Sequence, residues 1–113
     1  MILGLNKRGA LFVFPSPAEA QLRLEAIDVQ EEDFEFCDDR GQRYEIVFTI
    51  PPKVSSFGPV NLVDIGAFKL EATSSTDSEL PESFTARAVH IEHSFDASIT
   101  SVADLLRLLR SSD

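Results

Sequence analysis

Residues 25–39 are the most strongly biased stretch of this 113-residue chain, because eight of their fifteen side chains are carboxylates and none is basic. Within the stretch, Phe34 and Phe36 alternate with Asp33 and Glu35, which is the two-residue period of a half-buried strand. We expect the phenylalanines to face a core and the carboxylates to face away from it. The acidic stretch therefore joins packed elements at the surface and is not a disordered tail.

The length of the chain predicts a single domain, residues 1–113, with one hydrophobic core. The first residues lack the basic and then apolar pattern of a secretory signal, and no window approaches the roughly 18 apolar residues of a membrane span. We therefore expect a soluble cytoplasmic protein that does not bind membranes. Cys37 is the single cysteine, so an internal disulfide and a multi-cysteine zinc site are excluded. Its acidic neighbours raise the pKa of a thiol, which favours a structural role over a reactive one.

The net charge of −9 disfavours direct binding to nucleic acid, because phosphates attract the opposite sign and Lys7-Arg8 is the only basic cluster. A basic protein is the natural electrostatic partner of such a chain. The alternative is that the acidic residues serve solubility alone.

The first half of the chain predicts a hairpin followed by a helix. Two apolar runs, residues 2–5 and 10–14, flank an Asn-to-Gly connection, and the second run is apolar enough to lie near the centre of a sheet. Ser16 can cap a helix that begins at Pro17, with a buried stripe of Ala20, Leu24 and Ile27. Residues 20–26 also alternate, which leaves a strand open for that piece. We expect residues 28–33 to be a polar connector.

The second half predicts further strands and one more helix. Residues 34–37 and 43–50 alternate around a turn at 38–41 and form a second hairpin. We expect a loop over 51–59 after the Pro51-Pro52 pair, one long or two short strands over 60–72 with a bend at Gly66, a loop over 73–81 and a last strand over 84–95. Ser101 can cap a C-terminal helix.

The predicted fold class is therefore α+β. We expect an antiparallel sheet of about five to six strands, with one helix after the first hairpin and one helix at the C-terminus.

No motif in the chain indicates catalysis or a cofactor. His90 and His93 would lie on opposite faces of a strand unless a bulge intervenes, so they should not share a metal ion. A Gly-x-Ser-x-Gly turn and glycine-rich phosphate loops are absent from the sequence. We expect a protein that is not an enzyme, with no metal and no cofactor.

Several pieces of the first 41 residues resemble the small acidic α+β immunity proteins that bacteria encode beside secreted or contact-delivered toxins. These pieces are Val13-Phe14-Pro15-Ser16, Ala18-Glu19-Ala20, Leu24-Glu25-Ala26-Ile27-Asp28-Val29, Glu35-Phe36 and Asp39-Arg40-Gly41. The resemblance implies a cytoplasmic inhibitor that binds one cognate toxin and blocks it, commonly a nuclease with a basic cleft.

The predicted partner-binding residues are chosen by charge, because the resemblance carries no binding motif. Phe57, in its Pro/Gly/Ser-rich segment, is the candidate apolar anchor. The acidic candidates are Glu31, Glu32, Asp33, Glu35, Asp38 and Asp39. The same carboxylates could instead form a solvated strand edge that discourages aggregation.

Two other functions stay open at this point. The chain could be an interaction or assembly subunit unrelated to toxins, which uses a free sheet edge. It could also be a small ligand-binding domain with a pocket near His90 or His93.

Overall fold

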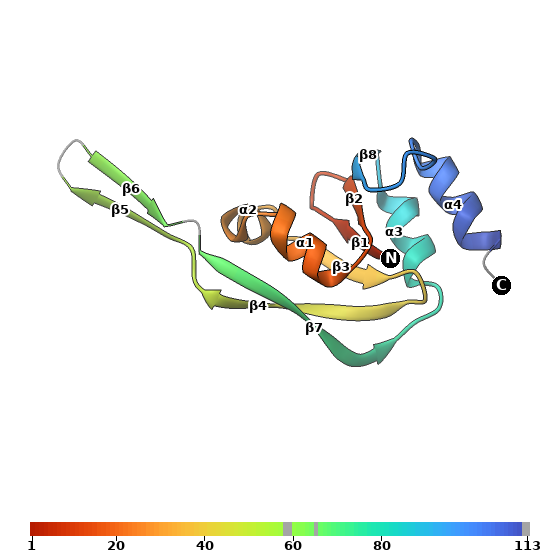
Figure 1. The fold of residues 1–113 in the computed structure, drawn as a ribbon, viewed down its shortest axis with the longest axis horizontal. Coiled ribbons are helices and arrows are strands. Elements are labelled where there is room, and N and C mark those ends of the chain that lie inside the picture. The colour runs from red at the N-terminus through yellow and green to blue at the C-terminus, as the bar shows by residue number, and fades with distance from the viewer. Residues whose placement is uncertain (58–59, 65, 112–113) are drawn as a thin grey trace.

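The computed structural model describes residues 1–57, 60–64 and 66–111, and of residues 54–57 and 60–64 it describes the backbone alone. The described chain is α+β, as the sequence predicts, with a mixed and mostly antiparallel six-stranded sheet (Figure 1). The strands of this sheet are β1 (Ile2–Leu5), β2 (Ala10–Phe14), β3 (Glu35–Asp38), β4 (Gln42–Ile50), β7 (Ala67–Thr76) and β8 (His90–Ser94). Their order is β7-β4-β3-β1-β2-β8, and only β2 and β8 are parallel.

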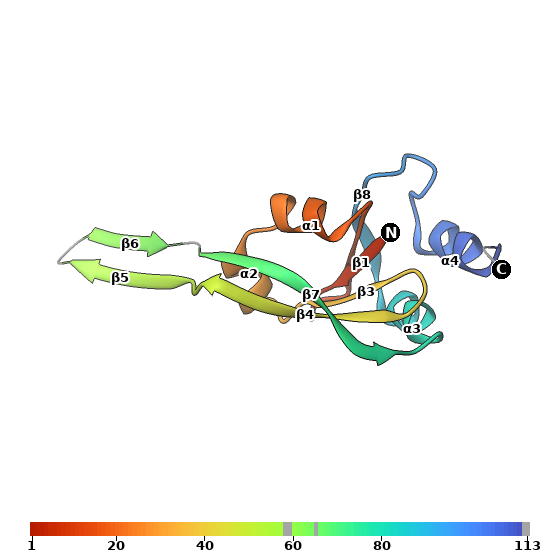
Figure 2. The ribbon, with the colours of Figure 1, turned by 60° about the horizontal axis from the view of Figure 1, so that its bottom comes forward.

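Strands β1, β2 and β3 form the centre of the sheet and are covered on both faces. The first hairpin is confirmed, with Ile2 opposite Phe14, and the hairpin of β3 and β4 is confirmed as well. On one face Ile2, Phe14 and Phe36 are buried against helices α1 (Pro17–Arg23) and α2 (Ala26–Glu31). On the other face Leu3 and Cys37 are buried against α3 (Leu80–Arg87) and α4 (Val102–Ser111). Figure 2 shows α1 and α3 on opposite sides of the central strands.

The start of α1 agrees with the sequence, because Pro17 is in its first turn and the Ser16 hydroxyl accepts a hydrogen bond from the Glu19 N–H at 3.3 Å. The single long helix and the polar connector over 28–33 are wrong. Leu24 is extended, with φ −99° and ψ 143°, and the chain then forms a second helix, α2. This break lets Leu24 pack on the core while Ala26 and Val29 are buried.

The strand predicted over 84–95 is wrong in its first half, because residues 80–87 form α3. Leu80 and Phe84 are buried one helical turn apart, and Pro81 lies in the first turn. Alternating apolar residues at 84, 86 and 88 favoured a strand, but the helical period fits the buried positions better. The C-terminal helix is confirmed as α4, whose Asp104 N–H donates to the Ser101 hydroxyl at 3.2 Å.

The segment after β4 forms a hairpin arm where a loop was expected. The Pro51-Pro52 pair ends β4, but the chain resumes as β5 (Lys53–Phe57), which pairs with β6 (Val60–Asp64). Gly66, with φ +75°, separates β6 from β7, so the two-strand reading of 60–72 is confirmed. The loop predicted over 73–81 is shorter than expected, since β7 continues to Thr76. The arm projects beyond the rest of the sheet (Figure 1), and the molecule is 56 Å along its longest axis.

Candidate protein-binding surface

Helix α2 and the residues that flank it display the first half of the acidic stretch. Ala26 and Val29 anchor the helix in the core, whereas Glu25, Asp28 and Glu31 are exposed at intervals of three residues. The helix ends before Asp33, which is exposed and adopts a left-handed conformation with φ +50°. The Phe34 N–H donates to the Val29 carbonyl at 3.3 Å, so the turn that presents Asp33 is closed by a backbone hydrogen bond.

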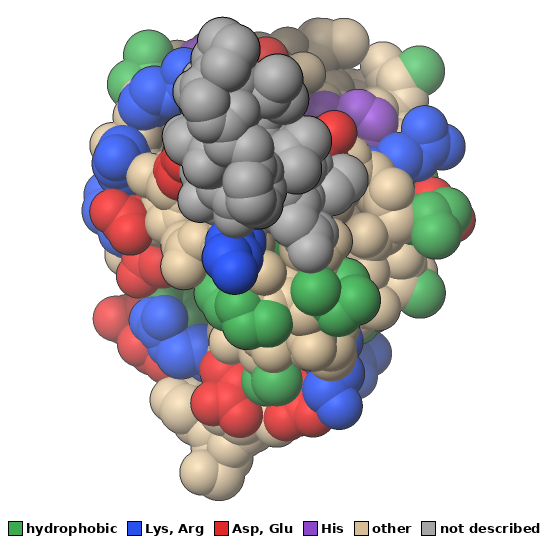
Figure 3. All heavy atoms as spheres, turned by 90° about the vertical axis from the view of Figure 1, so that its left-hand side faces the viewer, with side chains coloured by type: hydrophobic (Ala, Val, Ile, Leu, Met, Phe, Trp, Pro, Cys, Tyr) green, Lys and Arg blue, Asp and Glu red, His purple; other side chains and the backbone are tan. Residues whose placement is uncertain are grey.

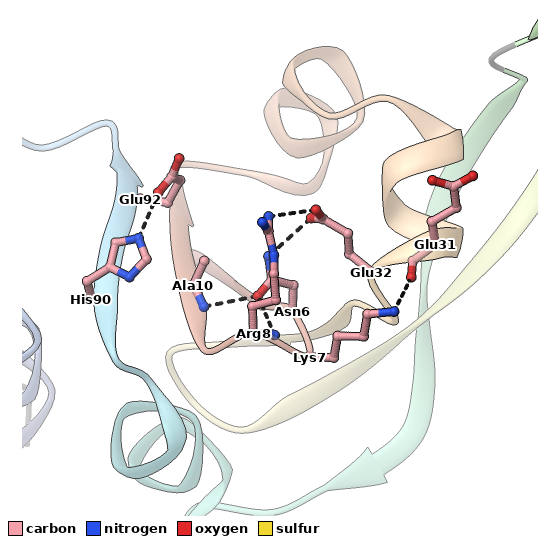
Figure 4. A network of polar contacts seen from close by, with 8 residues as sticks. All are labelled: Asn6, Lys7, Arg8, Ala10, Glu31, Glu32, His90 and Glu92. Atoms are coloured by element: carbon pink, nitrogen blue, oxygen red, sulfur yellow. Dashed lines mark hydrogen bonds and ion pairs between the residues drawn. The ribbon is translucent and has the colours of Figure 1, made fainter.

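Glu32 is half-buried and is neutralised within the molecule (Figure 4). Its carboxylate accepts hydrogen bonds from Arg8 at 2.6 Å and from the Asn6 side-chain amide at 3.1 Å. The side-chain oxygen Oδ1 of Asn6 in turn accepts from the backbone N–H groups of Arg8 and Ala10, each at 3.0 Å. Glu32 therefore links the C-terminal end of α2 to the turn between β1 and β2 through these hydrogen bonds.

Three more of the predicted residues also have internal partners. Glu35 pairs with Arg87 at 2.7 Å and with Arg43 at 3.7 Å. Asp39 pairs with the N-terminal ammonium group at 3.3 Å. Asp38 accepts from the N–H groups of residues 40 and 42, each at 2.9 Å, and so closes the turn after β3. These carboxylates stabilise the fold, and they lie on β3 and in the turn that follows it.

Glu31 behaves differently from its neighbour Glu32. Its backbone carbonyl accepts from the Lys7 ammonium at 2.8 Å, while Figure 4 shows its carboxylate pointing away from that lysine. Within the described part of the chain, no ion pair and no side-chain hydrogen bond involves the carboxylates of Glu25, Asp28, Glu31 or Asp33. We call these four residues the α2 acidic patch.

The α2 acidic patch only partly matches the predicted site. Glu31 and Asp33 were predicted, whereas Glu25 and Asp28 were missed, because residues 28–33 were read as a connector. The spacing of 25, 28 and 31 would have placed them together if a helix had been expected there. Viewed from the arm end, the visible Asp and Glu side chains are interspersed with Lys and Arg (Figure 3), so the face shown in this view is not a continuous acidic surface.

The remaining candidates are distributed elsewhere. The backbone of Phe57 belongs to β5, and its side chain lies outside what the structure describes. Cys37 is fully buried, and burial followed by the nearby charge of Asp38 raises the pKa of its thiol to about 12. A pKa this high keeps the thiol protonated and unreactive at neutral pH, in agreement with a structural role.

A shift in register does intervene in β8, contrary to the regular strand expected there. His90 is opposite Ala10 and His93 is opposite Phe12, so both histidines lie on the same side of the sheet. The two side chains nevertheless have separate contacts. His90 is bonded to Glu92 at 2.7 Å, and the ring of His93 lies 5.1 Å from that of Phe14. Among the described residues, no group of three His, Cys, Asp or Glu side chains could hold a metal ion.

Neither histidine lines the best-formed grooves of the described surface, which lie beside α4, at the turn between β1 and β2, at the start of β1, and between α1 and β7. In the part of the chain that the structure describes, none of the helices has the length and apolar character needed to cross a membrane.

Comparison with protein-family models, with curated protein sequences and with solved structures finds no match to this chain. The fold and the surface define an α+β domain whose mixed sheet is flanked by helices. Around α2 it displays four carboxylates that form no ion pair with the residues that the structure describes.

Proposed function

We propose that this chain is a cytoplasmic immunity-type inhibitor, which binds a basic toxin through the α2 acidic patch and blocks it. The toxin would be a protein with a basic cleft, such as a nuclease. The observation that supports the proposal is that the eight carboxylates of residues 25–39 fall into two groups, those with partners inside the described part of the molecule and those without. Four of them have internal partners that fix the fold, and the four of the patch are left without an ion pair in the described structure.

Electrostatics supports this choice of partner. Carboxylates on an exposed helix can occupy the positions of substrate phosphates in a basic cleft, and they accelerate encounter with a positive surface at low salt. An inhibitor that acts by filling the cleft of the toxin needs only a stable interface with it. Such an interface buries about 800 Å² on each partner, which is roughly one eighth of the 6711 Å² surface of this molecule.

The first test is capture from the native host at low salt, with the tagged chain as bait. We expect one basic protein that harms cells when it is expressed alone and becomes harmless when the chain is co-expressed. Recovery of the chain alone, or of a partner that is harmless by itself, would contradict the proposal.

Two variants with the same net charge test whether protection depends on the α2 acidic patch. The patch variant carries Glu25→Gln, Asp28→Asn, Glu31→Gln and Asp33→Asn. The control variant carries Glu45→Gln, Glu79→Gln, Glu82→Gln and Glu92→Gln, all outside α2 and β7. Each changes the net charge from −9 to −5, since four carboxylates are removed. Protection of cells should be weakened by the patch variant and kept by the control variant.

A further inference from the structure

Strand β7 is an edge strand of the six-stranded sheet, hydrogen-bonded to β4 on one side only. Residues Glu45, Ile46 and Val47 of β4 pair in regular register with Glu71, Leu70 and Lys69. In an antiparallel pair, alternate residues of an edge strand point their N–H and C=O groups away from the partner strand. Such outward groups form a row to which another strand can pair.

One of these outward N–H groups donates a hydrogen bond to a side chain of α1. The Leu70 N–H donates to the side-chain carbonyl of Gln21 at 2.8 Å, so it does not donate to β4. The Gln21 amide oxygen thus occupies the position that a backbone carbonyl of a further strand would take. By the same alternation, the N–H groups of Phe68 and Ala72, two residues away on each side, point in the same direction.

A groove of about 370 Å³ runs beside this edge, between β7 and the junction of α1 and α2. Its apolar lining includes Leu22, which is 80 % exposed, and the half-buried Leu24, together with the core residues Ala26 and Phe68, which are buried. Among the described residues that line the groove, Glu25 alone is ionisable, and it belongs to the α2 acidic patch. The groove meets β7 at Ala67 and Phe68, at one end of the row of outward groups. It combines the apolar surface of Leu22 and Leu24 with the Glu25 carboxylate, which forms no ion pair within the described residues.

We propose that this groove binds an extended, lysine- or arginine-containing segment of the partner, which pairs with β7 as an added strand. Its backbone carbonyl replaces the Gln21 amide oxygen on the Leu70 N–H, its aliphatic side chains cover Leu22 and Leu24, and a basic side chain reaches Glu25. Charge selects this occupant over a second copy of the chain, because two copies carry −9 each and present the same carboxylate to one another. The inference rests on the proposed function for the basic character of the partner.

The test uses the full chain, labelled with ¹⁵N, and two synthetic probes. These are an acetylated and amidated octapeptide of alternating valine and lysine, and its counterpart with glutamate in place of lysine. We expect the lysine peptide to shift the backbone amide signals of Phe68, Leu70 and Ala72 together with the side-chain amide of Gln21. The glutamate peptide should bind at least tenfold more weakly.

Variants separate pairing at the edge from attraction by charge alone. Ala72→Pro removes an outward N–H but no hydrogen bond between β7 and β4. We expect this substitution to weaken binding of the lysine peptide at least tenfold, although it changes no charge. Leu22→Lys should weaken binding similarly, whereas Val89→Lys should not. Val89 is the matched control because it is 76 % exposed and follows α3, outside the groove. Gln21→Ala should bind at least as tightly as the unmodified chain.

Several results would overturn the inference: shifts confined to other residues, equal binding of the two peptides, or affinity unchanged by both Ala72→Pro and Leu22→Lys. Shifts of the same amides on raising the protein concentration without peptide would identify a second copy as the occupant and would also overturn it. Because no toxin is used, failure here leaves the growth test of the patch variant intact, and the two proposals fail separately.

Discussion

Replacing Glu32 with lysine should destabilise the protein, and replacing the adjacent Glu31 with lysine should not. Each substitution changes the net charge from −9 to −7, since one negative charge becomes positive. Both residues lie at the end of α2, so the two variants differ mainly in the partners of the original carboxylate. The comparison tests directly whether the acidic stretch is divided into carboxylates that stabilise the fold and carboxylates that are available for binding.

The structure gives the expected magnitude. Glu32 accepts a hydrogen bond from Asn6, which is only 4 % exposed, and a bond between a charged group and a buried amide contributes about 1.5 to 3 kcal/mol. The pair with Arg8 adds at most about 1 kcal/mol, because the guanidinium is 67 % exposed. Glu32→Lys should therefore lower the free energy of unfolding by about 2 to 4 kcal/mol. Glu31→Lys should change it by no more than about 0.5 kcal/mol.

Urea denaturation of the three proteins measures these differences, with thermal melting as a second probe. At roughly 4 °C for each kcal/mol in a domain of this size, the Tm of Glu32→Lys should fall by about 8 to 16 °C. Equal loss of stability in both variants, or no loss in either, would refute the claim that the Glu32 carboxylate stabilises the fold and the Glu31 carboxylate does not.

Three further predictions concern the core and the pH dependence of stability. Phe84→Ala should lower the free energy of unfolding by about 3 to 5 kcal/mol, because the Phe84 side chain of α3 is fully buried in the core, and a shift below about 1 kcal/mol in urea denaturation would contradict this packing. The thiol of Cys37 should react with a disulfide reagent only after unfolding. The free energy of unfolding should fall as pH rises above 9.0 toward 12, because the pKa of Cys37 is raised in the folded protein and the thiol of the unfolded chain therefore loses its proton first. This fall should be absent in Cys37→Ala. Hydrogen bonds from Thr100 hold the pKa of Asp104 below its usual value, so the N-terminus of α4 should lose amide protection as pH falls below 3.8, and Asp104→Asn should show no such pH dependence.

The parts of the fold that were predicted correctly carry local signals. Ser16 and Pro17 mark the start of α1, Ser101 marks the start of α4, and the connection from Asn6 to Gly9 marks the first hairpin. In each case residues within a few positions of one another contain the information. Capping and turn geometry depend on those same neighbours.

The missed elements are short or depend on distant partners. Helices α2 and α3 have six and eight residues, too few for a clear helical period to outweigh an apparent alternation. Strand β8 finds its place by pairing with β2, so that His90 lies opposite Ala10 from a remote part of the chain. No local pattern specifies that parallel pairing.

The candidate site was only half predictable for a similar reason. The acidic stretch contains no basic residue in sequence, but folding brings Arg8, Arg43 and Arg87 to it from other elements. Which carboxylates are neutralised depends on these tertiary contacts. The sequence identified the acidic segment, and the arrangement of α2 then selects Glu25, Asp28, Glu31 and Asp33 within it.

The most direct test of this account is the salt dependence of the Kd between the chain and its captured partner, measured for the unmodified protein and the two matched variants. We expect the Kd of the unmodified protein to rise at least about tenfold between low and physiological salt, because exposed charges are screened. The patch variant should bind more weakly with a flatter dependence, and the control variant should follow the unmodified protein. If the patch variant and the control variant give the same Kd and the same salt dependence, the α2 acidic patch is not the binding surface.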